Sequence, residues 1–174
     1  DTDTLAIREP EEVLSALQLQ IMQNMQTADD GIDNVDVPDV AFRDYDIRGI
    51  AGTEIDEAFA NRLGRALGTV MRRSGEETVY LARDGRLSSP KLADAMQAGL
   101  LASGCSVVYL GEITTPALNF ALHYGGHSSS GIMVTASHNP AIYNGFKIII
   151  QQEVISGQLL QLLKPMVRGG HFAQ

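Results

Sequence analysis

Residues 131–150 have the sequence GIMVTASHNPAIYNGFKIII, in which two apolar runs with strong β preference flank a polar segment. The runs cover residues 131–135 and 145–150, and nine residues separate them. A parallel connection between strands needs about a dozen residues or more, usually in a helix. The second run is therefore predicted to return antiparallel beside the first, so the sheet that contains both is mixed.

The segment before this return alternates helices and strands. Apolar residues at helical spacing follow Thr53 and Asp56, which have the spacing of a capping box, and Gly75 ends this helix. Two further helices are predicted to be capped by Ser89 and Thr115, each of which precedes a proline. Strands are predicted over residues 78–83 and 105–110.

This alternation predicts an α/β, three-layer domain with a mixed, mostly parallel four-stranded sheet between helices. The carboxyl ends of parallel strands gather ligand-binding loops at one edge of such a sheet. Residues 84–89, 111–115 and 136–144 follow successive strands, so we expect these loops at that edge.

The N-terminal region differs from the rest in pattern. Residues 10–26 place Leu14, Leu17, Ile21 and Met25 at the spacing of a short amphipathic helix, and residues 27–40 have the composition of an acidic flexible linker. We therefore predict an N-terminal extension over residues 1–40 and a domain over residues 41–174. A last helix is expected at residues 159–167.

Charge and composition exclude several classes of protein. The net charge of −8 comes from residues 1–41, with ten acidic side chains against Arg8, whereas residues 42–150 carry ten of each sign. This neutral body argues against nonspecific nucleic-acid binding. Cys105 is the single cysteine and is expected to be a buried structural thiol. No run approaches the roughly 18 apolar residues of a membrane span, so the segment is expected to be soluble and cytoplasmic.

The polar segment at residues 136–144 carries the strongest candidate for chemistry. It delivers Ser137, His138 and Asn139 to the ligand edge, with Ser137 as nucleophile or phosphate carrier. The alternative is a Ser-Asn-Pro turn whose polar groups only bind backbone. No G-x-S-x-G elbow or phosphate-binding P-loop is present. Lys147 follows on the returning strand and either approaches the serine or is a solvated edge charge.

Two arginine-containing segments are ambiguous by themselves. Residues 42–49, FRDYDIRG, form either a binding cluster that includes Tyr45 and Arg48 or a surface ion-pair group. Arg83 and Arg86 in the segment RDGR either bind phosphate or close a strand. The histidines at 123, 127 and 171 lack metal-site spacing, which makes a self-contained zinc site improbable.

Taken in order, five motifs resemble the first domain of the α-D-phosphohexomutase superfamily, and their form is most similar to bacterial phosphomannomutase/phosphoglucomutase. The motifs are YDIRG at 45–49, RDGR at 83–86, TP at 115–116, TASHNP at 135–140 and YNGFK at 143–147.

The resemblance implies an enzyme that moves phosphate between the 1- and 6-hydroxyls of a hexose phosphate through a 1,6-bisphosphate. Ser137 would be the phosphoserine, and its phosphoryl oxygen would help to coordinate Mg²⁺. Lys147 matches a general base or acid, and Arg48 an arginine that assists proton transfer or phosphoryl charge. His138 would line the site, and Tyr45 matches a substrate-contacting tyrosine.

The match covers only residues 42–150, and the chain starts at Asp1 rather than Met. No Asp-Gly-Asp metal loop follows, so we expect a fragment in which the other Mg²⁺ ligands and domains are absent and which is inactive alone. Two alternatives remain. One is a phosphoglucosamine mutase domain, and the other is a noncatalytic interaction module that acts through residues 1–40. The oligomeric state is left open.

Overall fold

A computed structural model describes residues 9–26, 37–170 and 172 as an α/β structure. The helices are α1 (Pro10–Gln26), a 3-10 turn η1 (Asp39–Ala41), α2 (Glu57–Arg73), α3 (Ser89–Ala102), α4 (Thr115–Tyr124) and α5 (Gly157–Gly169). The strands are β1 (Ile47–Ile50), β2 (Thr78–Arg83), β3 (Ser106–Glu112), β4 (Gly131–Val134), β5 (Tyr143–Ile150) and β6 (Glu153–Val154).

The sheet is mixed, with the order β1-β5-β4-β2-β3 and with β6 paired to β5. Strand β2 runs parallel to β3 and β4, whereas β5 runs antiparallel to β4, β1 and β6. The antiparallel return and the mixed α/β class are confirmed. The predicted number of four strands is corrected to six, and antiparallel pairs outnumber parallel ones. The two additional strands are short, and Arg48 and Gly49 interrupt the apolar pattern of β1.

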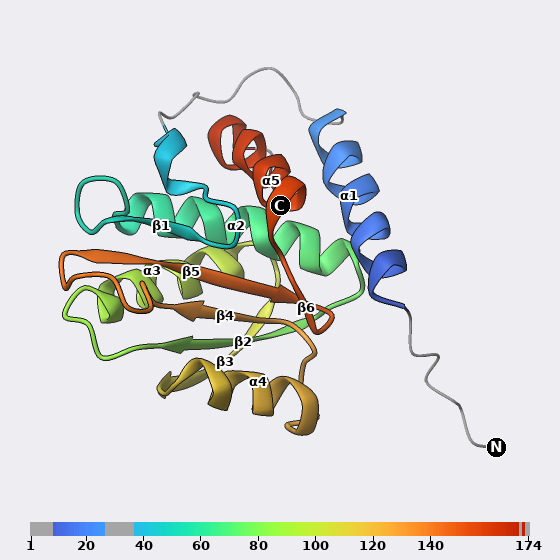
Figure 1. Cartoon of the computed structure of the whole chain (residues 1–174). Helices are drawn as coiled ribbons and strands as arrows, with labels where there is room; N and C mark the ends of the chain where they lie inside the picture. The colour runs from blue at the N-terminus through green and yellow to red at the C-terminus, as the bar shows by residue number, and fades with distance from the viewer. Residues whose placement is uncertain (1–8, 27–36, 171, 173–174) are drawn as a thin grey trace.

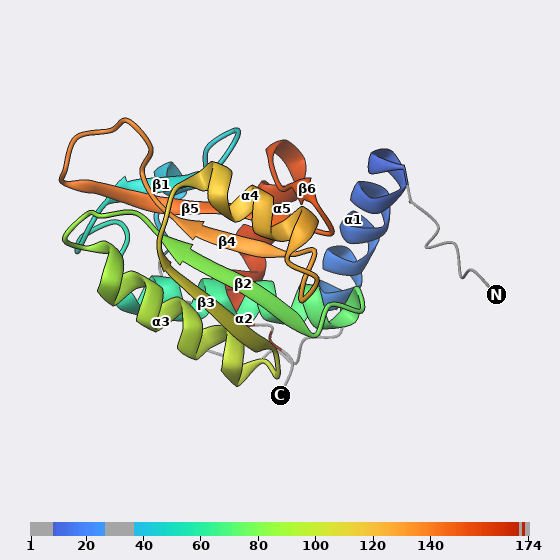
Figure 2. The same cartoon turned by 90° about the horizontal axis from the view of Figure 1, so that it is seen from below.

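Helices cover both faces of the sheet (Figure 1). On one face α2, α3 and α5 pack over a large apolar cluster that includes Leu81, Val134 and Phe146. On the other face α4 packs against a smaller cluster that includes Tyr80 and Met133. Figure 2 shows α4 lying across this second face. The three-layer arrangement is therefore confirmed.

Helix α2 begins later than the proposed capping box suggests. The side chain of Asp56 caps the helix by accepting a hydrogen bond from the backbone N–H of Phe59 at 2.7 Å. Thr53 lies in the preceding turn, where its hydroxyl donates to the carbonyl of Ile50. The predicted stop is confirmed, because Gly75 has a left-handed φ of 90° directly after the C-cap.

The starts of α3 and α4 each lie one residue from the prediction. Ser89 is the first helical residue rather than the N-cap, which is Ser88, because the Ser89 hydroxyl is directed to Asp84. Helix α4 is capped by Thr114, whose side chain accepts a hydrogen bond from the N–H of Ala117.

Helix α1 packs against the rest of the structure rather than standing apart from it. Val13, Leu17 and Ile21 are buried in the same apolar cluster as the sheet and α5. Val37, which precedes the predicted boundary at residue 41, is also buried in this cluster. Residues 27–36 of the proposed linker lie outside the described residues, and the division into extension and domain stays a prediction. Within the described chain, no helix combines the length and apolarity that a membrane crossing requires.

Candidate active site

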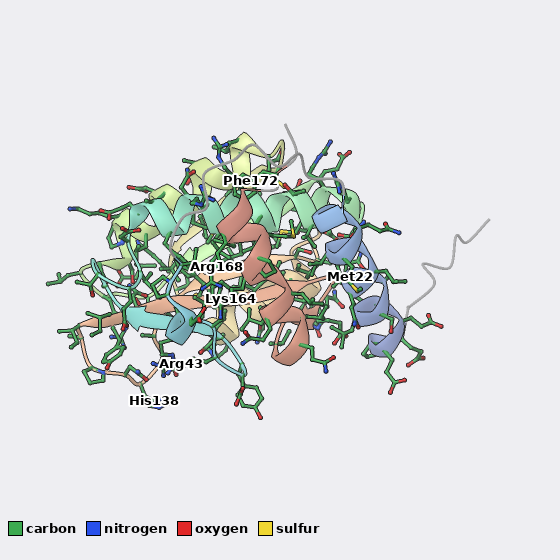
Figure 3. The ribbon with its side chains drawn as sticks, turned by 90° about the horizontal axis from the view of Figure 1, so that it is seen from above. Met22, Arg43, His138, Lys164, Arg168 and Phe172 are labelled. Atoms are coloured by element: carbon green, nitrogen blue, oxygen red, sulfur yellow. The ribbon has the colours of Figure 1, made fainter. Side chains whose placement is uncertain are left out.

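Ser137 lies in the loop between β4 and β5, here named the serine loop (residues 135–142). Its side chain is exposed, and its backbone has a φ of 56°, in the left-handed region that a residue with a Cβ rarely adopts. The Ser137 N–H donates to Thr135 Oγ1 at 3.0 Å, and Ser137 Oγ lies 3.4 Å from His138 Nδ1. Figure 3 labels His138 at the outer end of this loop.

A second group of side chains, here named the Asp46 cluster, consists of Asp46, Arg48 and Lys147. The carboxylate of Asp46 accepts hydrogen bonds from Arg48 Nη2 and, at 3.4 Å, from Lys147 Nζ. Asp46 and Arg48 are buried, and the Lys147 side chain is 30% exposed. The Lys147 ammonium therefore contacts Asp46, which through Arg48 is connected to the serine loop.

The pairing of β1 with β5 builds this cluster. Arg48 lies opposite Gly145, and Lys147 lies opposite Met133 on β4. A Cβ at position 145 would lie 2.0 Å from the carbonyl oxygen of Ile47, so only glycine permits this approach of the two strands. The alternation of β5 places Phe146 in the large core and leaves Lys147 on the α4 face.

Asn139 connects the serine loop to the Asp46 cluster. Arg48 Nη1 donates to Asn139 Oδ1 at 2.6 Å, only two residues beyond Ser137. The Nε of Arg48 is buried and makes no hydrogen bond within the described structure. The Arg48 Nε–H is thus a donor without an acceptor among the described residues, and the loop bound by Arg48 exposes the Ser137 hydroxyl to solvent.

Asp84 and Arg86 hold the serine loop from the end of β2. Arg86 donates to three backbone carbonyls of this loop, to the carbonyl of Tyr143 at the start of β5, and to Asp84 Oδ2 at 3.0 Å. Asp84 accepts further hydrogen bonds from the hydroxyls of Ser89 and Thr135. Burial by itself would raise the pKa of the Asp84 carboxyl, but these hydroxyls and Arg86 together hold it below its ordinary value.

Arg83 has a different surrounding from Arg86. It donates to Glu112 at 2.8 Å and to the Tyr109 hydroxyl at 3.0 Å, and the hydrogen bond to Glu112 is the chief cause of a raised pKa for Arg83. The two arginines of the RDGR segment thus bind protein groups. Tyr45 is 77% exposed just before β1.

The structure brings Arg48, Lys147 and the serine loop together, and it shows contacts of two further residues that the motifs contain. Asp46 and Asn139 were each quoted within a motif, but neither was given a role. Asp46 could have been found from its position two residues before Arg48, because this spacing places both side chains on one side of an extended segment.

The described residues do not form a complete metal site. Among them, no group of three or more His, Cys, Asp or Glu side chains could hold a metal ion. Mg²⁺ prefers near-octahedral oxygen ligation. Of the predicted ligand set, the described residues therefore fit only the single oxygen at Ser137.

Comparison with known proteins shows the family of the chain. The profile of the family described as phosphoglucomutase/phosphomannomutase, alpha/beta/alpha domain I, matches residues 39–158. A phosphomannomutase/phosphoglucomutase of Pseudomonas putida is 42% identical over 73% of this chain and 27% of its own length. A phosphoglucomutase of Neisseria gonorrhoeae is 42% identical over 75% of this chain and 28% of its own length.

A solved structure of a phosphoglucomutase/phosphomannomutase family protein from Burkholderia thailandensis superposes with a TM-score of 0.76 and 39% identity. The match covers 80% of this chain and 32% of the Burkholderia chain. The fold is thus that of an alpha/beta/alpha domain I in a class of sugar-phosphate-converting enzymes. The chain belongs to the phosphoglucomutase/phosphomannomutase family, and it spans little more than a quarter of the length of the curated relatives named above.

Proposed function

We propose that this chain supplies the phosphoserine domain of a hexose phosphate mutase that acts on mannose or glucose phosphates. The observation that carries the proposal is the link from the exposed Ser137 loop, through Asn139, to Arg48 and the Asp46 cluster. Membership of the family supports the same class of reaction.

In this proposal Ser137 carries the phosphoryl group. A phosphoserine has about −1.5 to −2 charges and three acceptor oxygens, which require cationic or donor groups nearby. Arg48 supplies one such group, and its Nε has an unused donor. Catalysis of phosphoryl transfer depends largely on positioning and electrostatic stabilisation. The serine loop, hydrogen-bonded to Arg48 and connected through it to the Asp46 cluster, is consistent with both requirements.

The transfer exchanges one P–O bond for another. A sugar hydroxyl oxygen forms a bond to phosphorus as the bond from phosphorus to Ser137 Oγ breaks, and the hydroxyl proton ends on the freed Ser137 oxygen. In the second half the phosphoryl group at the other sugar position moves to Ser137 Oγ, and the serine proton ends on the hydroxyl that forms there. Lys147 is proposed to exchange the hydroxyl proton, with Asp46 fixing the ammonium. His138 is exposed in the serine loop and Tyr45 is exposed before β1, and both are proposed to contact the sugar phosphate.

Mg²⁺ would supply charge neutralisation at the phosphoryl group when bound. This chain would contribute the Ser137 phosphoryl oxygen to it, and the remaining ligands would come from outside the described residues.

The test uses the full-length enzyme that contains this domain. Ser137→Ala is expected to abolish turnover of mannose and glucose phosphates, and intact mass should show that the phosphoryl group on the purified enzyme is lost. Ser106→Ala, at the exposed start of β3 on the opposite edge of the sheet, is the matched control and should keep full activity. Full activity in Ser137→Ala would overturn the proposal.

A further inference from the structure

All five N–H donors of the Arg86 guanidinium make hydrogen bonds. Four go to backbone carbonyls of residues 137–143, and one goes to the Asp84 carboxylate. Nη1 donates to the carbonyls of Pro140 at 2.7 Å and Tyr143 at 3.1 Å. Nη2 donates to the carbonyls of Ser137 at 2.9 Å and Asn139 at 2.7 Å. Nε donates to Asp84. Because arginine has five donors, none remains for a phosphate.

These contacts hold the serine loop along its length. The four carbonyl groups belong to residues 137–143, so one planar side chain fixes the loop from the serine to the start of β5. The Arg86 side chain is only 13% exposed, which limits the competition of water for these acceptors.

A second connection runs from Asp84 to the Ser137 backbone. An ionised carboxylate only accepts hydrogen bonds, so the Thr135 hydroxyl must donate its proton to Asp84 Oδ2, at 2.7 Å. A lone pair of the same hydroxyl then accepts the Ser137 N–H at 3.0 Å. Asp84 therefore sets the direction of the hydroxyl that holds Ser137.

Both connections end at Ser137, whose backbone conformation is unfavourable. Ser137 has a φ of 56°, and a non-glycine residue keeps such a conformation only when its surroundings impose it. Here Thr135 binds the N–H of Ser137 and Arg86 binds its carbonyl, so both polar groups of its backbone are fixed.

We propose that Arg86 is a positioning residue, which together with Asp84 and Thr135 holds Ser137 in the orientation needed for phosphoryl transfer. The inference rests on the proposed function of Ser137 as the phosphoryl carrier. Misplacement of a reacting group by about 1 Å can lower a rate about 100-fold. Lysine has a point charge and three donors without a planar fork, so it cannot replace these five contacts.

The experiment measures kcat and KM of the full-length enzyme with a hexose phosphate for Arg86→Ala and Arg86→Lys. The expected result is a loss of about 100-fold in kcat for Arg86→Ala with KM little changed, and at most slight recovery in Arg86→Lys. Added guanidinium, at concentrations that leave the circular dichroism spectrum native, should partly restore kcat in Arg86→Ala alone.

Arg83→Ala is the matched control, because this arginine lies three residues earlier and its side chain contacts Glu112, Tyr109 and the Asp84 carbonyl instead of the serine loop. Its kcat should stay within a few-fold of the wild-type value. If Arg86→Ala does not fold, Thr135→Val carries the test, since it removes the acceptor of the Ser137 N–H while keeping a β-branched side chain, and kcat should fall about tenfold or more.

The outcomes separate this inference from the proposed function. A folded Arg86→Ala or Thr135→Val enzyme with wild-type kcat would overturn the positioning role, even when Ser137→Ala is inactive. Activity in Ser137→Ala would instead remove the function on which the positioning role depends.

Discussion

Asp46 is the side chain on which both cations of its cluster converge. It is buried directly before β1, and it pairs with Arg48 on β1 and with Lys147 on the neighbouring strand β5. Removing one partner of a buried ion pair typically costs about 3–5 kcal/mol, because the remaining charge is left without compensation.

Asp46→Asn should therefore reduce the free energy of unfolding by about 2–4 kcal/mol, somewhat less than for a fully buried pair because Lys147 is partly exposed. Urea unfolding followed by circular dichroism measures this difference. Asp44→Asn is the matched control, since Asp44 is an exposed acidic residue two positions earlier, and its effect should stay within about 0.5 kcal/mol. Equal stability of the two variants would contradict the compensating role of Asp46.

Cys105 should behave as an inert thiol. The residue is 4% exposed, and burial is the chief cause of a raised pKa for its thiol. A raised pKa lowers the fraction of reactive thiolate. At pH 8 a chromogenic disulfide reagent should therefore react with Cys105 only after urea unfolds the chain. Rapid stoichiometric reaction of the native protein would show that the thiol is accessible.

The sequence predicted some of the site residues and not others. Ser137, Arg48 and Lys147 were found because each lies in a distinctive short motif. Asp46 and Arg86 were not given these roles, because the partners that define them are distant in sequence. Lys147 is 101 positions from Asp46, and the carbonyl of Asn139 is 53 positions from Arg86. Such contacts depend on strand pairing, which no local pattern specifies.

At the scale of elements, η1 is fixed to α5 by a small ion-pair group. The carboxylate of Asp39 contacts Lys164 Nζ at 2.5 Å and also Arg168, whose Nη2 donates to the Val37 carbonyl at 3.0 Å. Figure 3 shows both basic side chains on α5. The hydrogen bond from Lys164 is the chief cause of a lowered pKa for Asp39, and Arg168 acts in the same direction.

This group should make the docking of η1 dependent on pH. Since the pKa of Asp39 is lower in the folded chain, its ionised form stabilises the fold above the unfolded value of about 3.9. That contribution is lost as the pH falls through the folded pKa. The melting temperature of the wild type should therefore exceed that of Asp39→Asn at pH 7, and the difference should shrink as the pH falls below the unfolded pKa and vanish below the lowered folded pKa.

Thermal unfolding across this pH range tests the expectation, with Asp94→Asn on the exposed side of α3 as the control. A difference between wild type and Asp39→Asn that stays constant down to pH 2 would show that ionisation of Asp39 is not its source.

The sequence predicted the long elements well and the short ones poorly. Helices α2 to α5 and strands β2 to β5 have strong periodicity or apolar runs, and all were predicted within a few residues. Strand β1 was missed because two of its four residues are Arg and Gly, whose place in a sheet is determined by the partner strand β5. The starts of α3 and α4 were displaced by one residue because each proline is preceded by two hydroxyl residues, and the sequence does not show which of the two is the N-cap.

At the scale of the molecule, α1 shares the main core with the sheet and α5. Leu17 is fully buried in that core, whereas Leu19 on the same helix is 62% exposed. The helix therefore contributes to the stability of the whole described structure and is more than an appended surface element.

Leu17→Ala should reduce the free energy of unfolding by about 2–4 kcal/mol, the range for truncating a buried leucine, and unfolding should remain a single transition. Leu19→Ala makes the same chemical change on the exposed side and should alter stability by less than about 0.5 kcal/mol. Urea unfolding of both variants provides the measurement. Equal effects would mean that α1 is not docked in solution.

The pairing of β1 with β5 also determines when the site can exist. Arg48 and its acceptor Asn139 are 91 positions apart, and the strands that align them come from opposite ends of the matched region. Contacts with such long sequence separation close slowly and late in folding. During synthesis, a nascent chain that ends before β5 lacks Lys147, the second partner of Asp46, and the strand that pairs with β1. The Asp46 cluster is thus expected to form only after the strand carrying Lys147 has left the ribosome. Under the proposed role of Ser137, the topology disfavours phosphorylation of a partly made chain.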